Sequence, residues 1–252
     1  MSREYLTSDL HLLHTNIIKY AERKEYQSTD ESCEKMSWDI VNTINATIPD
    51  EKDVTLWNLG DLFYGRLFSA KTLNQLKEYV SIMKGKNRTL NIVLGNHDKQ
   101  FKQHVDWKKL KPLTKASSFT EIFQELGFTN VYDKPILYKE NIIFSHEPVF
   151  LTPGNQFKNI HGHVHQKGLK DSEGYNTLYF CYDLENYAMV RKAYRDSGRP
   201  LPELSLKKDW EDFQTDSRLY FNSCWDYHNK VLNLNDVIKE LNKENYQGQE
   251  CR

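Results

Sequence analysis

Short apolar runs in this sequence stop, again and again, at an aspartate, an asparagine or a histidine. The five places read Asp9-Leu10-His11, Gly60-Asp61, Gly95-Asn96-His97-Asp98, His146 and Gly162-His163-Val164-His165. Apolar runs of this length, bounded by glycine and polar residues, are typical of buried strands. In open α/β sheets, ligands bind in the crevice outside the carboxyl ends of the strands. We therefore expect these polar side chains to meet at one edge of a sheet.

Asp9 and His11 illustrate how one strand end could hold an ion. Alternation in an extended segment places residues two apart on the same side of the chain. A carboxylate and an imidazole would then face one ion together. At another strand end, Gly95 would allow the sharp bend that turns Asn96 and His97 off the strand.

Between the strands, apolar residues recur at helical spacing. Met36, Ile40, Ile44 and Ile48 form one stripe, and further helical segments include Leu73 to Met83, Ser118 to Gly127 and Leu234 to Leu241. The expected N-terminal caps are Ser28 with Glu31, Ser69, and Ser118 with Glu121. Alternating strands and helices, followed by several short strands, predict an α/β sandwich. The basic turn from Lys84 to Arg88 is interpreted as a solvated connection.

Composition narrows the range of functions. Hydrophobic residues make up 38% and charged residues 27%, which is a globular balance, and the formal net charge is -1. No global field therefore draws the chain to nucleic acid or to an anionic membrane. The apolar runs are too short to span a bilayer, and no signal-peptide segment is evident. The four scattered cysteines are typical of a reducing compartment, so we expect a cytoplasmic protein.

The ordered series Asp-x-His, Gly-Asp, Gly-Asn-His-Asp, His and Gly-His-x-His resembles that of the calcineurin-like metallophosphoesterase family, in its small phosphodiesterase type. The resemblance covers residues 4 to 165 and resumes near residue 218. It implies a four-layer α-β-β-α sandwich with a dinuclear metal centre at the sheet edges. By this resemblance, one ion takes Asp9, His11, Asp61 and His165, and the other takes Asp61, Asn96, His146 and His163.

In that arrangement Asp61 bridges the two cations. Two divalent cations about 3.5–4 Å apart would clamp a phosphate and share a hydroxide that attacks phosphorus. Imidazole, carboxylate and amide ligands suit Mn, Fe, Co, Ni or Zn. Manganese is favoured because related enzymes commonly use it.

The resemblance also assigns catalytic roles beside the metals. His97 would donate a proton to the leaving oxygen, and Asp98 would fix its tautomer. His14 is read either as a surface histidine or as a phosphate contact at a helix N-terminus. Arg66 is a second candidate for substrate binding.

Two departures bear on the substrate. Protein phosphatases that resemble this family carry Gly-Asn-His-Glu and an arginine close after Gly-Asp, whereas this chain has Asp98 and a more distant Arg66. We therefore expect a phosphodiesterase acting on a small, nucleotide-like phosphoester. The alternatives are a phosphomonoesterase or protein phosphatase, a nuclease that binds nucleic acid, and a non-catalytic scaffold.

We expect residues 1–252 to form a single domain with an insertion at about 166–217. That stretch is too long for a plain loop in a compact domain, and it is rich in tyrosine, lysine and arginine. It could be a surface excursion or an oligomer contact. It could also be a lid that shapes substrate choice.

Overall fold

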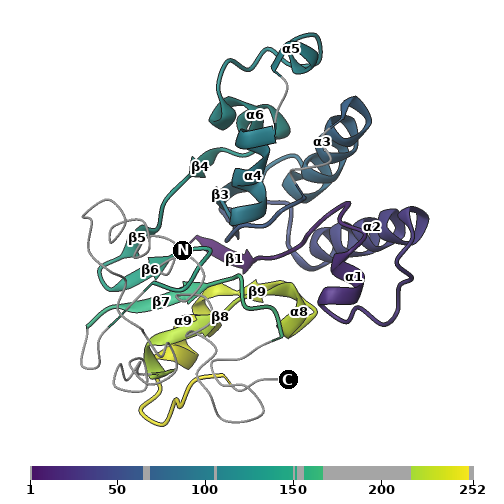
Figure 1. Cartoon of the computed structure of the whole chain (residues 1–252). Coiled ribbons are helices and arrows are strands. Elements are labelled where there is room, and N and C mark those ends of the chain that lie inside the picture. Colours follow the sequence, from purple (N-terminus) through teal and green to yellow (C-terminus); the bar gives the residue numbers. More distant parts are fainter. Residues whose placement is uncertain are drawn as a thin grey trace, which may run out of the picture.

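Two β-sheets packed face to face form the centre of the computed structural model, which describes residues 2–64, 69–104, 107–149, 151, 156–166 and 217–249 (Figure 1). The first sheet has the strand order β4-β3-β2-β1-β9 and the second has the order β5-β6-β7-β8. The strands of the first sheet are β1 (Arg3–Thr7), β2 (Val54–Asn58), β3 (Thr89–Val93), β4 (Asn130–Tyr132) and β9 (Leu232–Asn233). Those of the second are β5 (Ile136–Lys139), β6 (Ile142–Phe144), β7 (Lys158–His161) and β8 (Tyr220–Asn222).

Most neighbouring strands run parallel, which places their carboxyl ends at a common edge. Strands β1 to β4 are parallel, as are β6, β7 and β8, whereas β9 and β5 pair antiparallel with their neighbours. Because β1, β2, β3, β6 and β7 precede the polar motifs, this topology brings the motifs to the junction of the two sheets.

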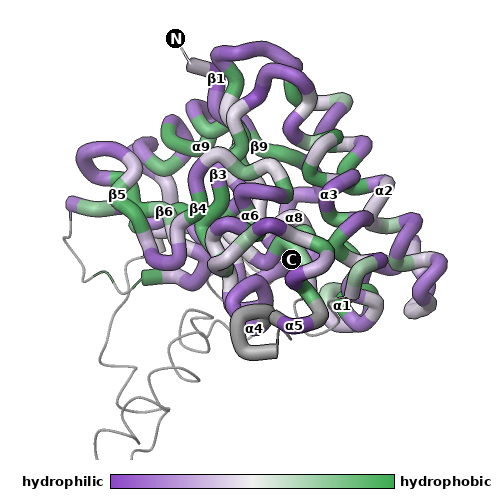
Figure 2. The backbone as a smooth tube through the Cα atoms, turned by 90° about the horizontal axis from the view of Figure 1, so that it is seen from above, coloured by the Kyte–Doolittle hydropathy of each residue, from purple (hydrophilic) through white to green (hydrophobic). Residues whose placement is uncertain are grey.

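Helices flank the two sheets (Figure 1). Their bounds are α1 (Ile17–Tyr20), α2 (Asp30–Thr47), α3 (Ala70–Lys84), α4 (Asn96–His104), α5 (Trp107–Leu110), α6 (Phe119–Leu126), η2 (Ser217–Leu219), α8 (Trp225–His228) and α9 (Leu234–Leu241). Figure 2 shows hydrophobic and hydrophilic residues alternating along α2 and α3, as an amphipathic helix requires. The apolar stripe predicted on α2 is buried in one core cluster with residues of α3, α6 and the first sheet.

A second core cluster lies between the sheets. It contains Leu6 and Val93 from the first sheet, Phe144 and Ile160 from the second, and residues of α9, which packs against β1, β9 and β8. Two sheets with helices outside them confirm the predicted α/β sandwich. Within the described residues, no helix is both long and apolar enough to cross a membrane.

The helix caps are mostly as predicted. Ser69 and Ser118 accept hydrogen bonds from the backbone of α3 and α6, which confirms both. The prediction for Ser28 is wrong, because Thr29 has the extended backbone of a cap and its hydroxyl accepts from the Ser32 N–H.

The prediction that the turn from Lys84 to Arg88 is solvated is wrong for Arg88, which is buried. Arg88 is only 4% exposed, and its guanidinium donates to the carbonyls of Ile48, Pro49 and Met83. A buried guanidinium is tolerated because it satisfies carbonyl groups near the ends of α2 and α3. Apart from its first and last residues, the expected insertion at 166–217 lies outside the described residues.

Candidate metal centre

The residues that follow the strands adopt a conformation that the sequence did not suggest. Asp9, His11, Asp61, His163 and His165 all have positive φ angles, between 49° and 73°. This left-handed backbone is uncommon for residues other than glycine and costs of order 1–3 kcal/mol each. The expectation that Asp9 and His11 share a face through extended alternation is therefore wrong. Both side chains still enter one site, because each turns sharply inward.

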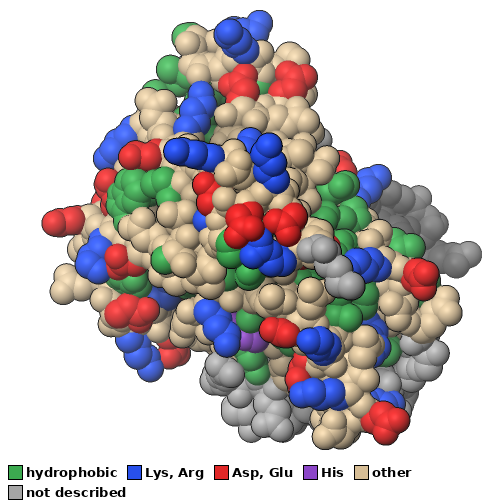
Figure 3. Space-filling view, turned by 180° about the vertical axis from the view of Figure 1, so that it is seen from behind, with side chains coloured by type: hydrophobic (Ala, Val, Ile, Leu, Met, Phe, Trp, Pro, Cys, Tyr) green, Lys and Arg blue, Asp and Glu red, His purple; other side chains and the backbone are tan. Residues whose placement is uncertain are grey.

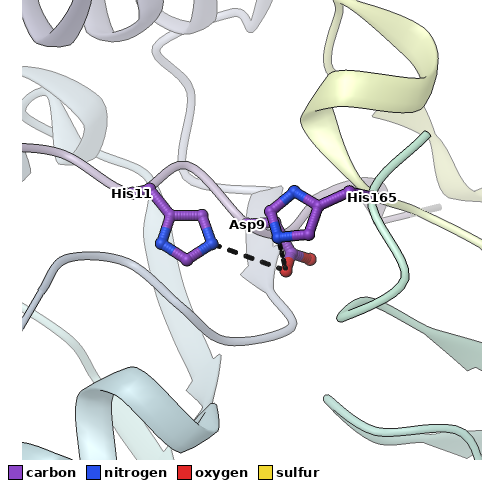
Figure 4. Close-up of side chains that lie close together, drawn as sticks. All are labelled: Asp9, His11 and His165. Atoms are coloured by element: carbon purple, nitrogen blue, oxygen red, sulfur yellow. Dashed lines mark ion pairs between the residues drawn. The ribbon is translucent and has the colours of Figure 1, made fainter. Parts of the chain in front are cut away.

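The first group of converging side chains is Asp9, His11 and His165. Figure 4 shows both imidazole rings turned toward the carboxylate of Asp9. The Nε2 atoms of His11 and His165 lie 3.9 Å and 3.8 Å from Asp9 Oδ1. The two rings stack with their centroids 5.0 Å apart. Asp9 is itself fixed, because its oxygens accept hydrogen bonds from the His163 N–H.

The second group is Asp61, Asn96, His146 and His163. The Nε2 atom of His146 lies 3.3 Å from Asp61 Oδ2 and 2.9 Å from Asn96 Oδ1. The Nδ1 atom of His163 lies 3.1 Å from Asn96 Oδ1 and 3.2 Å from His146 Nε2. His146 is oriented by its other nitrogen, Nδ1, which lies 2.9 Å from the carbonyl oxygen of Leu59.

Asp61 lies between the two groups. Its Oδ2 atom is 3.6 Å from His11 Nε2 on one side and 3.3 Å from His146 Nε2 on the other. Its Oδ1 atom accepts the His97 N–H at 2.8 Å. One carboxylate thus faces both clusters, which is the position that a bridging ligand needs.

Within the second group, Asp61 and His146 shift the pKa of each other. Burial by itself would lower the pKa of His146, but the Asp61 carboxylate outweighs it and raises that pKa to about 10. Burial by itself would raise the pKa of Asp61, but His146, His11 and His97 hold it below its usual value. A divalent cation bound between these groups would compensate the charge of the buried Asp61 carboxylate.

Two glycines make room for the carboxylates. A Cβ on Gly95 would lie 2.1 Å from Asp61 Oδ1, and a Cβ on Gly162 would lie 2.4 Å from Asp9 Oδ2. Both distances are far shorter than van der Waals contact. The glycines of the Gly-Asn-His-Asp and Gly-His-x-His motifs are therefore required by the close approach of a neighbouring loop.

The donor set fits divalent cations. Two ligand atoms that each lie about 2.1 Å from one ion are about 3–4 Å apart, which matches the spacings in both groups. Among the described residues, His11 Nε2 is buried without a hydrogen-bond partner, although it faces two carboxylates. Three sets of side chains have donor atoms close enough to hold an ion: Asp9, His11 and His165; His11, Asp61 and His97; and Asp61, His146 and His163.

His97 and Asp98 are arranged differently from each other. The Nε2 atom of His97 lies 3.9 Å from Asp61 Oδ2, and its ring is partly exposed. Asp98 is fully buried, and its two oxygens accept the N–H groups of Leu62 and Gly95. Within the described residues, His97 Nδ1 has no hydrogen-bond partner. The expected contact in which Asp98 orients the His97 ring is therefore not formed. The Asp98 carboxylate instead binds the backbone of the turn at Gly95 and of Leu62.

Of the two residues predicted to contact substrate, His14 and Arg66, the structure describes only His14. His14 is buried, stacks on Tyr64 with ring centroids 4.2 Å apart, and has its Nδ1 atom 3.3 Å from His11 Nδ1. The reading of His14 as a surface histidine is therefore wrong. Burial lowers the pKa of His14 to about 4, so it is a neutral neighbour of the site. Arg66 lies outside the described residues.

Sequence analysis assigned no role to Arg23, Asp226 or Cys224, which surround the first group. Asp226 Oδ2 lies 2.7 Å from His165 Nδ1, and the Cys224 thiol donates to Asp9 Oδ2 at 3.1 Å. Burial raises the pKa of Cys224 well above its usual value, so it is present as a neutral thiol. No signal in the sequence pointed to Arg23, whereas Cys224 and Asp226 lie in the segment near residue 218 where the family resemblance resumes.

Two solved structures resemble the chain distantly. One is the protein of unknown function AQ665 from Aquifex aeolicus, with 20% sequence identity and a TM-score of 0.47, over 94% of this chain and 98% of that one. The other is the nuclease MPE of Pseudomonas putida, with 19% identity and a TM-score of 0.39, over 64% of this chain and 61% of that one. At these values neither similarity bears on the activity of this chain.

A search of curated proteins gave no match. The sequence model of the calcineurin-like phosphoesterases matches residues 4–245, which is nearly the whole chain. The donor groups at the strand ends are the kind of site that a metal-dependent phosphoesterase needs. The chain therefore belongs to the calcineurin-like phosphoesterase family.

Proposed function

We propose that this protein is a phosphodiesterase that uses two divalent cations to hydrolyse a small, nucleotide-like phosphodiester. The observation that carries the proposal is the position of Asp61, which faces His11 on one side and His146 on the other. The ligand set we propose is Asp9, His11, Asp61 and His165 for one cation, and Asp61, Asn96, His146 and His163 for the other. Cations bound there would polarise the phosphoester and lower the pKa of water toward roughly 7, which makes hydroxide available at neutral pH.

In the proposed reaction, water gives up a proton to solvent and the resulting hydroxide bonds to phosphorus. The bond from phosphorus to the leaving oxygen breaks, and protonated His97 gives its proton to that oxygen. His97 is suited to this role because its ring is partly exposed beside Asp61. Because Asp98 holds the turn at Gly95, we assign it the role of keeping His97 in place rather than of setting its tautomer.

Among the metals that suit these donors, we propose manganese, with Fe, Co, Ni or Zn as alternatives. The imidazole, carboxylate and amide groups of the site are donors that suit each of these metals, and manganese is preferred because related enzymes commonly use it. We further propose that the protein acts in the cytoplasm. The free cysteines Cys33 and Cys224 of the described residues are in keeping with a reducing compartment.

A small substrate is favoured over nucleic acid by the charge of the molecule. The net charge is -1, and on the face seen in Figure 3 the Lys and Arg side chains are interspersed with Asp and Glu. A nucleic-acid interface is usually a patch of one sign. We propose the expected insertion at about 166–217 as the element that shapes substrate choice within a single domain.

The proposal is tested by comparing hydrolysis of bis(p-nitrophenyl) phosphate and p-nitrophenyl phosphate by protein loaded with Mn2+. The expected result is faster turnover of the diester, and loss of turnover after chelation. Faster turnover of the monoester would instead identify a phosphomonoesterase. No turnover of either compound with any of the five metals would contradict the enzyme proposal altogether, and would favour a scaffold.

A further inference from the structure

A buried ion pair lies directly behind the first group of donors. Arg23 Nε donates to Asp226 Oδ1 at 2.6 Å, and Arg23 Nη2 donates to Asp226 Oδ2 at 3.0 Å. The side chains are only 5% and 2% exposed. A buried pair of this kind contributes little net stability by itself, because both charges lose their hydration. The contacts that the pair makes with other residues are therefore the more informative feature.

Asp226 makes one of these contacts with His165. Its Oδ2 atom, which accepts from Arg23, also lies 2.7 Å from His165 Nδ1. With Nδ1 donating to a carboxylate, the other nitrogen of His165 has a free lone pair. That atom, Nε2, faces Asp9 Oδ1 at 3.8 Å. Asp226 therefore selects the tautomer and the ring orientation that a metal ligand needs.

Arg23 makes the other contacts. Its Nη2 atom donates to the carbonyl of Asp9 at 2.9 Å, and its Nη1 atom donates to the carbonyl of Leu10 at 3.0 Å. These carbonyls belong to the turn in which Asp9 and His11 have positive φ. One guanidinium thus joins the strained turn after β1 to the carboxylate that orients His165.

We propose that Arg23 and Asp226 are positioning residues for one cation only, the cation held by Asp9, His11 and His165. This inference rests on the dinuclear site proposed above. It goes further, because it makes the binding of the two cations depend on different residues. In the described part of the chain, the hydrogen bonds of the pair to other residues lead to the first group, apart from a contact of Arg23 Nη1 with the sulfur of Met36. The second group uses a different support, since His146 is fixed by the backbone carbonyl of Leu59.

The pair also explains why the end of the chain belongs to the site. Asp226 lies on α8, 203 residues after Arg23. Neighbouring contacts tie the same segment to the loops after β1 and β7, since Trp225 N donates to Ser8 O at 3.0 Å and Asn222 Nδ2 donates to the carbonyl of His165 at 2.8 Å. Correct folding of this late segment is therefore a condition for binding the first cation.

The test is a titration of the metal-free protein with Co2+, followed by its visible absorption and by metal analysis after dialysis. We expect two bound equivalents in the wild type. Asp226→Asn is expected to keep one equivalent and to bind the other about 10- to 100-fold more weakly, as for other residues that support a ligand histidine. Arg23→Lys is expected to weaken the same equivalent, because lysine cannot make both the forked pair and the two carbonyl contacts.

Arg88→Lys is the matched control. Arg88 is as deeply buried as Arg23 and also donates to backbone carbonyls, but it lies at the amino end of β3, away from the site. We expect it to lose stability and to retain both equivalents. If Asp226→Asn bound both cations as the wild type does, or weakened both equally, the inference would be overturned.

A second measurement avoids the variants. In wild-type protein loaded with 113Cd, we expect the nitrogen of His165 that couples to cadmium to be Nε2, and coupling to Nδ1 would overturn the inference. A wild type that binds no metal would overturn both proposals. Unequal cations in a protein without phosphoesterase turnover would contradict only the proposed function.

Discussion

At the scale of single residues, the site depends on carboxylates that are buried without a matching fixed cation. Asp9 and Asp61 are almost inaccessible, and the charges that face them are histidines rather than lysine or arginine side chains. Burying a carboxylate is costly unless it is paired or coordinates a metal. This makes the effect of each substitution on metal content as informative as its effect on rate.

Asp61→Asn is expected to abolish hydrolysis and to lower the content of both cations. The amide removes the negative charge that faces His11 and His146. Metal analysis of the purified variant beside Asp39→Asn, a surface carboxylate paired with Lys35, provides the comparison. Loss of a single cation would show that Asp61 does not bridge.

His97→Ala is expected to slow the reaction about 10²- to 10⁴-fold for a diester with an alkoxide leaving group. The loss for a p-nitrophenyl diester is expected to be much smaller, since that leaving group needs little protonation. Both cations should remain. Because His97 also lies within reach of His11 and Asp61 as a donor, loss of metal in this variant would identify it as a ligand instead of an acid.

At the scale of elements, strand ends and loops are held by close approach. The loop after β7 passes so near the loop after β1 that Gly162 has no room for a side chain beside Asp9 and Ser8. A turn at the amino ends of β2 and β3 is also held by a contact with another loop. There the carboxylate of Asp50 accepts the backbone N–H groups of Lys86 and Asn87.

Gly162→Ala is expected to displace the Asp9 carboxylate and to weaken metal binding, since the added Cβ would lie 2.4 Å from Asp9 Oδ2. Metal titration is the measurement. Gly127→Ala serves as control. Its φ of 125° makes alanine strained there, but the added Cβ would meet Val80 and Lys84, neither of which is a proposed metal ligand. If the two variants bound metal equally well, steric support of Asp9 would be refuted.

Asp50→Asn is expected to lower stability at neutral pH, and to do so less at acid pH. Hydrogen bonds from the backbone of Lys86 and Asn87 lower the pKa of Asp50 in the folded protein. Its contribution is therefore present above the unfolded pKa of about 3.9 and is lost as the pH falls through the folded value. Urea unfolding of both proteins at pH 7 and pH 3 checks this. A difference that grows toward pH 3 would contradict the assignment.

At the scale of the whole molecule, the site lies where two sheets and the end of the chain meet. The core between the sheets joins Leu6 of β1, Phe144 of β6 and Val237 of α9. A ligand bound at that junction stabilises only the folded arrangement, because the unfolded chain does not bring the donors together.

Addition of Mn2+ to the metal-free protein is expected to raise its melting temperature. A ligand at 100 times its Kd stabilises by about 2.7 kcal/mol. For a chain of this size that corresponds to a rise of about 5–10 °C. Thermal denaturation followed by circular dichroism measures it, and the doubly substituted Asp9→Asn, Asp61→Asn protein should show no rise. An equal rise in both proteins would place the metal elsewhere.

Much of this structure was accessible from the sequence because its signals are local. The helical stripe from Met36 to Ile48 and the caps at Ser69 and Ser118 depend on residues only three or four positions apart. The polar residues after each apolar run mark strand ends in the same way. The prediction of a cap at Ser28 was wrong because the neighbouring Thr29 also carries a hydroxyl that can cap the helix.

The sequence by itself thus determined the alternation of strands and helices, which follows from side-chain periodicity, and its family resemblance supplied the proposed donor residues. The tertiary structure alone decided how the donors are held. It set the left-handed turns at Asp9 and His11. It also made Asp98 accept hydrogen bonds from the backbone of Leu62 and Gly95, and it paired Arg23 with Asp226. These arrangements depend on hydrogen bonds between segments far apart in the chain, and local pattern carries no information about which distant partner a polar group will meet.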